Sequence, residues 1–172
     1  KMVVTGFTGP YKLTDEIRKQ NEQIVHVCAG SGVVPSFSII KYDLRMNEGT
    51  KHTLVYSNKK REDIIFHDDF AQLEREFPDR FNVIHTLTRE GDDFDYSNGT
   101  RQGRISQSLL SEAIPNPEDT AVFVCGPDHF PWQKRAAKEK GEELPPSFLS
   151  SALGFLDEVG IPKERITKES YG

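Results

Sequence analysis

Residues 24–36 read Ile24-Val25-His26-Val27-Cys28-Ala29-Gly30-Ser31-Gly32-Val33-Val34-Pro35-Ser36. The stretch begins as an apolar run fit for a buried strand, passes through two glycines one residue apart, and reaches a proline and a serine where a helix should start. Glycines let the backbone come close to a diphosphate, and the N–H groups of a helix's first turn attract it. The stretch predicts a phosphate-binding turn. The same residues would also fit a strand-to-helix turn that needs glycine for its geometry alone.

The composition is that of an ordinary globular chain. Its 172 residues are enough for one sizeable core and too few for two comfortable domains. Hydrophobic residues make up 35% of the chain and charged residues 28%, which argues against a disordered protein. The net charge of −5 argues against nucleic acid as the main partner, because neutralising phosphates requires a basic surface. No apolar run approaches the ~20 residues of a membrane span, so we expect none.

The cysteines and histidines indicate a reduced protein without a metal site. Cys28 and Cys125 each close an apolar, strand-like run and lack the spacing of zinc ligands. Such thiols fit a cytoplasmic protein better than a disulfide scaffold. The five histidines are scattered without the H-x-x-x-H spacing of a helical metal site, so we expect no metal.

Apolar runs alternate with helical patterns along most of the chain. We expect five strands, at about residues 23–28, 52–56, 81–86, 120–125 and 165–168. Helices are predicted between them, and the clearest carries Phe66, Phe70, Leu73 and Phe77 at spacings of four, three and four. The alternation indicates an α/β fold, a three-layer, doubly wound, five-stranded parallel sheet covered on both faces.

Ligands of such open sheets bind beyond the carboxyl ends of the strands, where the strand order reverses. The turns that reach this edge are residues 29–32, 57–58, 88–89 and 125–127. The glycine turn departs from the usual dinucleotide-binding motif, because Pro35 takes the place of the third glycine. The second strand also ends in polar and basic residues instead of the acid that would hold a ribose hydroxyl. A standard NAD dehydrogenase is therefore disfavoured.

The pattern instead resembles the C-terminal nucleotide-binding domain of the ferredoxin–NADP reductase superfamily, over almost the whole chain and in the same order. The matching motifs are the turn Gly30 to Pro35, Tyr56-Ser57-Asn58, Asp63-Ile64-Ile65-Phe66, Thr88-Arg89, Gly103-Arg104-Ile105, Cys125-Gly126-Pro127 and a final aromatic, Tyr171. The resemblance implies a ferredoxin reductase-like fold that binds NADP or NAD. Because Ser57 and Thr88 replace the usual glycine and serine, the choice between the two nucleotides stays open.

The resemblance also implies roles for these residues. The cofactor-binding residues would be Gly30, Ser31, Gly32, Val33, Pro35, Ser57, Asn58, Thr88, Arg89, Arg104, Gly126 and Pro127. The glycine turn would receive the diphosphate, while Thr88 and Arg89 would contact the adenosine ribose or its 2′-phosphate. The catalytic residues would be Cys125, beside the nicotinamide, and Tyr171, stacked on the flavin. As alternatives, Cys125 would be a small buried residue, both arginines solvated side chains and Tyr171 a frayed terminal residue.

The same resemblance implies a second domain. Residues 1–14 would be the tail of a preceding FAD-binding barrel, and residues 15–172 the NAD(P)-binding domain. The expected enzyme is an NAD(P)H-dependent flavin oxidoreductase that passes hydride from NAD(P)H to FAD and electrons to an iron–sulfur protein or oxygenase. This fragment alone would be inactive. The alternative function is a non-catalytic dinucleotide-sensing or scaffold subunit of an electron-transfer complex.

Residues 128–146, after the fourth strand, form an insertion that the family pattern does not explain. The stretch reads as irregular and partly basic, and it carries Trp132, the only tryptophan. Two interpretations remain open, a docking element for an acidic electron carrier and a solvated loop.

Overall fold

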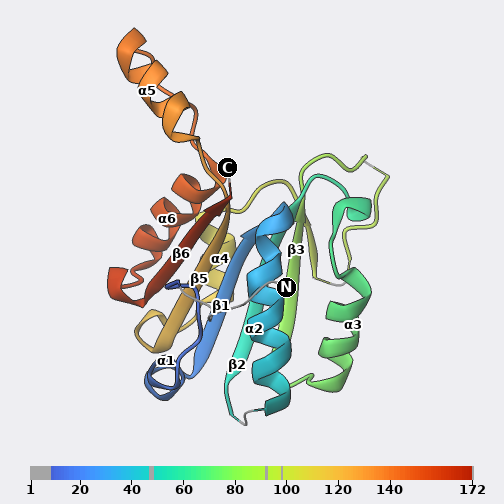
Figure 1. Cartoon of the computed structure of the whole chain (residues 1–172). Coiled ribbons are helices and arrows are strands. Elements are labelled where there is room, and N and C mark those ends of the chain that lie inside the picture. Colours follow the sequence, from blue (N-terminus) through green and yellow to red (C-terminus); the bar gives the residue numbers. More distant parts are fainter. Residues whose placement is uncertain (1–8, 47–48, 92, 98, 172) are drawn as a thin grey trace, which may run out of the picture.

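The protein is built on a six-stranded parallel sheet (Figure 1). The computed structural model describes residues 9–46, 49–91, 93–97 and 99–171. The strands are β1 (Gln23–Ala29), β2 (Lys51–Asn58), β3 (Phe81–Leu87), β4 (Thr100–Gln102), β5 (Thr120–Pro127) and β6 (Ile166–Tyr171), in the order β4-β3-β2-β1-β5-β6. The helices are α1 (Asp15–Gln20), α2 (Val33–Met46), α3 (His67–Glu76), α4 (Gln107–Ala113), α5 (Pro131–Lys140) and α6 (Phe148–Val159). The doubly wound α/β fold predicted from the sequence is confirmed.

Alternating side chains of the strands build a core on each face of the sheet. Val25 and Val27 of β1 point to one face, where α4 and α6 pack over them. Cys28 points to the other face, toward the buried side of α2 and α3. Because both faces are covered, the central strands are apolar along nearly their whole length. Three layers result, as the sequence predicts.

The sheet has one strand more than the five expected. β4 pairs with β3 through only three residues, from His85 opposite Thr100 to Leu87 opposite Gln102. Its residues are polar and largely exposed, so they carry no apolar alternation that sequence patterning could detect. The segment that follows β3 therefore ends in a short edge strand.

The amino-terminal segment packs against the α2 face of the sheet. Residues 1–8, part of the predicted barrel tail, lie outside the described residues. The hydroxyl groups of Tyr11 and Ser36 lie 2.7 Å apart, and the Tyr11 ring meets Phe123 edge-on. Helix α1, which the sequence did not predict, buries no residue completely. Its Arg18 reaches the buried Asp43 of α2 at 2.5 Å.

Residues 128–146, expected to be irregular, contain helix α5. In Figure 1 this orange helix extends away from the rest of the molecule. Gln133 caps its start by accepting a hydrogen bond from the backbone N–H of Phe130, and Gly141 ends it with φ +68°. The prediction of irregular structure was therefore wrong. α5 lacks the apolar face of a core helix, and Ala137 is its single buried residue.

Candidate nucleotide-binding site

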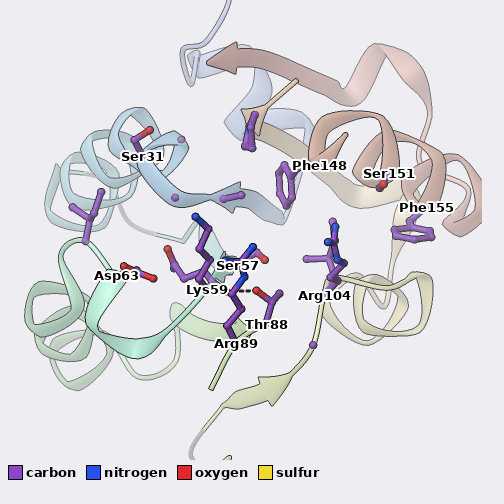
Figure 2. A pocket seen from close by; sticks show the side chains of 18 residues that line it. Ser31, Ser57, Lys59, Asp63, Thr88, Arg89, Arg104, Phe148, Ser151 and Phe155 are labelled. Atoms are coloured by element: carbon purple, nitrogen blue, oxygen red, sulfur yellow. Dashed lines mark hydrogen bonds between the residues drawn. The ribbon is translucent and has the colours of Figure 1, made fainter. Parts of the chain in front are cut away.

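A pocket of about 860 Å³ opens at the carboxyl ends of the strands (Figure 2). Strand order reverses here, because β1 lies between β2 and β5. The lining residues are Ala29, Gly30, Ser31, Gly32, Ser57, Asn58, Lys59, Asp63, Ile65, Thr88, Arg89, Gly103, Arg104, Ile105, Pro127, Phe148, Ser151 and Phe155. They come from the ends of the five strands β1 to β5, from the segment between β2 and α3, and from α6.

The glycine turn forms one wall of the pocket. Gly30 to Gly32 make a single 3-10 turn between β1 and α2, and Gly30 adopts φ +52°, a region that favours glycine. The hydroxyl of the buried Tyr56 donates a hydrogen bond of 2.9 Å to the Gly30 carbonyl, which fixes the turn to β2. The first N–H groups of α2 follow the turn directly.

Gly32 brings the ends of β1 and β5 into contact. A Cβ atom on Gly32 would lie 2.4 Å from the carbonyl oxygen of Cys125 and 3.0 Å from the Cα of Gly126. Both neighbours are backbone atoms, so they cannot rotate away as a flexible side chain can. This close approach requires glycine at position 32. The two glycine-containing corners, at the ends of β1 and β5, therefore form one continuous surface.

Hydrogen bonds between the ends of β2 and β3 form the opposite wall. The backbone N–H of Thr88 donates to the Asn58 carbonyl at 3.1 Å, and that of Arg89 donates to the Lys59 carbonyl at 2.8 Å. The Thr88 hydroxyl also donates to the Asn58 carbonyl at 3.3 Å, the dashed line in Figure 2. These bonds place the exposed Lys59 and Arg89 next to each other, directly after the paired strands β2 and β3.

The pocket is rich in positive charge. Lys59, Arg89 and Arg104 line it, against a single acidic lining residue, Asp63. Within the described part of the chain, none of these three cations has a carboxylate within ion-pair distance. An anionic ligand therefore meets cations that need not first break an ion pair.

Cys125 lies beneath the pocket and does not line it. Its side chain is buried, and burial together with Glu169 of β6 raises the pKa of the thiol to about 12. The thiol is therefore neutral at ordinary pH. The Phe148 ring covers Gly126, because a Cβ on that glycine would lie 2.4 Å from the ring. An aromatic side chain of α6 thus borders this corner of the pocket.

The sequence of this site matches a known family. The family described as Oxidoreductase NAD-binding domain matches residues 26–133, which include the glycine turn and Cys125-Gly126-Pro127. The chain belongs to this family. Within the part of the chain that the structure describes, no group of three or more histidine, cysteine, aspartate or glutamate side chains could hold a metal ion.

Relatives of this NAD-binding domain are named as reductases. NADH-cytochrome b5 reductase 2 of Saccharomyces cerevisiae is 30% identical over 169 residues, 95% of this chain and 52% of that protein. NADH-cytochrome b5 reductase 2 of Aspergillus niger is 32% identical over 169 residues, 94% of this chain and 48% of that protein. The chain spans about half the length of the curated relatives it matches.

Solved structures confirm the fold. The cytochrome b5 reductase domain of Ulva prolifera nitrate reductase has a TM-score of 0.65 at 21% identity, covering 88% of this chain and 49% of that one. Ferredoxin-NADP+ reductase from Plasmodium falciparum has a TM-score of 0.60 at 16% identity, covering 96% and 60%. The resemblance to ferredoxin reductases drawn from the sequence is therefore confirmed.

The NAD-binding domain brings together most of the residues that the sequence singled out. Lining the pocket are Gly30, Ser31, Gly32, Ser57, Asn58, Thr88, Arg89, Arg104 and Pro127. Val33, Pro35, Cys125 and Gly126 lie behind this wall, in the first turn of α2 or at the end of β5. The backbone of Tyr171 pairs with Pro127, so the final strand reaches the same edge.

Other lining residues of the NAD-binding domain were not expected. Lys59 and Asp63 follow strand β2, and Phe148, Ser151 and Phe155 come from α6. The basic run after β2 is the signal that could have indicated Lys59. No local pattern marks the α6 residues, because their place depends on how the helix packs on β5.

Proposed function

We propose that this NAD-binding domain positions NAD(P)H for hydride transfer to an FAD held by a preceding domain. Electrons then pass singly to an acceptor protein. The observation that carries this proposal is the close approach of Gly32 to the Cys125 and Gly126 backbone beside a cation-lined pocket. A dinucleotide needs such a surface, because its diphosphate approaches backbone closely while its two ends extend in opposite directions.

The residues present fit a pyridine dinucleotide. The turn Gly30 to Gly32 and the first turn of α2 would hold the diphosphate, and Thr88 with Arg89 would hold the adenosine ribose. The nicotinamide would lie at the β5 corner, near Pro127 and the Phe148 ring. When bound, the nicotinamide supplies the hydride and the flavin accepts it, while the protein supplies placement and electrostatics.

Cys125 and Tyr171 are proposed to act on the reacting rings. The neutral Cys125 thiol would contact the nicotinamide as a soft, uncharged group, after the Phe148 ring gives way at Gly126. Tyr171, whose backbone reaches the edge of the pocket beside Pro127, would stack on the flavin. Residues 1–14 would lead from the FAD-binding barrel, and the isolated domain would not turn over.

The acceptor is proposed to be a one-electron protein. Cytochrome b5 is the acceptor in the names of the relatives, and an iron–sulfur protein or oxygenase is the acceptor expected from the resemblance. A cytoplasmic location is proposed because Cys28 and Cys125 are buried thiols without a disulfide. Among the described residues, no helix is long and apolar enough to cross a membrane.

The full-length protein tests this function. We expect a yellow, FAD-containing protein whose flavin absorbance bleaches when NADPH or NADH is added. Cys125→Ser should slow the bleaching with little loss of nucleotide affinity, and an unchanged rate would remove Cys125 from the mechanism. Nucleotide binding without any bleaching would instead favour the dinucleotide-sensing or scaffold subunit.

A further inference from the structure

The insertion after β5 forms an arm, residues 128–146, whose two ends lie at the pocket. It starts directly after Pro127, and at its other end only Ser147 separates it from Phe148. Both Pro127 and Phe148 line the pocket. Helix α5 occupies the middle of the arm and stands clear of the sheet and of the other helices (Figure 1). Its ten residues give it a length of about 15 Å.

The base of the arm is fastened by hydrogen bonds. Ser147 donates to the Asp128 carboxylate at 2.8 Å, and a ring nitrogen of His129 lies 2.6 Å from the Pro145 carbonyl. Lys134 of α5 also pairs with Asp128, at 2.7 Å. Lys134 and Ser147 together hold the pKa of Asp128 at about 2, so the carboxylate stays charged in this role. These bonds hold the base of the arm and the start of α5 in a fixed orientation.

The arm exposes the kinds of side chain that bind proteins. Trp132 is 64% exposed and Phe130 43% exposed, and their rings are stacked with centroids 6.0 Å apart. Helical spacing places Lys134, Arg135 and Lys138 on one face of α5, with no acidic residue between them. Aromatic residues and arginine are the commonest anchors of protein interfaces. α5 carries four basic residues and one acidic residue, whereas the chain as a whole has a net charge of −5.

We propose that the arm is the docking element for an acidic electron-carrier protein. The proposal rests on the proposed function, because it places the flavin at the corner from which the arm rises. An acceptor must approach this corner to receive electrons, and its acidic surface would meet Arg135 and Lys138 while Trp132 packs against it.

The test uses the full-length protein with cytochrome b5 and a [2Fe–2S] ferredoxin, each chosen with an acidic surface. The charge-reversal double variant R135E/K138E is compared with K51E/K163E. The matched control changes two exposed lysines at the amino ends of the strands: Lys51 at the start of β2 and Lys163 in the 3-10 turn that precedes β6. We expect R135E/K138E to raise the Kd and the KM for at least one carrier roughly tenfold at low ionic strength and to flatten their salt dependence. Trp132→Ala should raise both without changing the salt dependence.

Two further measurements separate failure of docking from failure of the function. NAD(P)H-dependent reduction of ferricyanide needs no docking, so it should remain unchanged in the arm variants. Calorimetric binding of the oxidised carrier needs no turnover, so it tests docking even if the flavin reaction fails. Equal effects in the two double variants, or none, would overturn the proposal. So would loss of FAD from R135E/K138E, which indicates packing on the preceding domain, or arm-dependent binding to phosphatidylserine vesicles with unchanged carrier affinity.

Discussion

Gly32 is the residue at which geometry and binding are most tightly coupled. Alanine at this position would place its Cβ 2.4 Å from the Cys125 carbonyl oxygen, so the turn must move away from β5. We expect Gly32→Ala to lower the free energy of unfolding by about 1–3 kcal/mol and to abolish the thermal protection that NADP+ or NAD+ gives. Thermal unfolding with and without nucleotide measures both effects.

Gly154 in α6 supplies the matched control for this variant. An added Cβ there has no atom within 4 Å, and its position is helical. Gly154→Ala should therefore stabilise the protein by about 0.5–1 kcal/mol and leave the nucleotide protection intact. If both alanine variants bind nucleotide like the wild type, the surface formed by the ends of β1 and β5 is not the binding surface.

Lys59 and Arg89 are expected to decide which nucleotide binds better. Both are exposed on the pocket wall and neither has a described ion-pair partner, so they can meet a 2′-phosphate without losing another contact. The double variant K59A/R89A should lose roughly tenfold or more of the affinity for NADP+ and little of that for NAD+, as measured by calorimetry. An equal loss for both nucleotides would place these side chains at the diphosphate instead.

Local sequence was enough to predict the parts of the site that are built from backbone atoms. Residue type alone indicates the roles of the turn Gly30 to Gly32 and of Cys125-Gly126, because only glycine tolerates such close approach. Phe148 could not be predicted in the same way, since its ring reaches Gly126 only after α6 has packed on β5. Lys59 carried a visible signal in its basic run, but charge runs on strand ends are usually solvated.

At the scale of elements, an ionic contact joins α1 to α2. The helix has six residues, too few to be stable in isolation, and it buries none completely. Arg18 joins it to the buried Asp43 of α2. Arg18→Ala should therefore lower the free energy of unfolding by about 1.5–3 kcal/mol, the usual loss for a hydrogen bond to a charged group.

Urea unfolding of Arg18→Ala and Lys19→Ala provides the comparison. Lys19 is the exposed neighbour on the same helix, so its substitution should change stability by less than about 0.5 kcal/mol. Two variants of equal stability would show that α1 is held by its apolar contacts alone.

Elements were predictable where they bury an apolar face and not elsewhere. α3 follows the predicted spacing, with Phe70 and Leu73 buried, while Phe66 and Phe77 lie just outside its ends. α1, α5 and β4 have few or no buried residues, so periodicity gives no signal for them.

At the scale of the whole molecule, the two faces of the sheet differ in polarity. The α4 and α6 face is a continuous apolar core, whereas the α2 face holds a buried polar chain. In that chain, His26 Nε2 lies 3.1 Å from His52 Nδ1, and His52 Nε2 lies 2.9 Å from Asp43. Burial would raise the pKa of Asp43, but its hydrogen bonds from His52 and Arg18 outweigh that and hold it below its usual value.

The histidines of the sheet make stability depend on pH. Burial lowers the pKa of His26 and that of His52, in the latter case despite its bond to Asp43. Burial also lowers the pKa of His85 on β3, to about 4. In the unfolded chain these histidines titrate near pH 6.5. Below that pH the unfolded state binds protons that the folded state does not, so the free energy of unfolding must fall.

We expect the free energy of unfolding to be nearly constant above pH 7 and to decrease from about pH 6.5 toward pH 5. Each neutral histidine contributes a slope of up to about 1.4 kcal/mol per pH unit. Urea unfolding at a series of pH values measures this slope. His26→Leu should reduce it by one histidine's share, because the leucine cannot bind a proton. A wild-type curve that is flat from pH 7 to pH 5 would mean that the buried histidines already carry protons in the folded protein, and the apolar packing of His26 against Phe123 argues against that state.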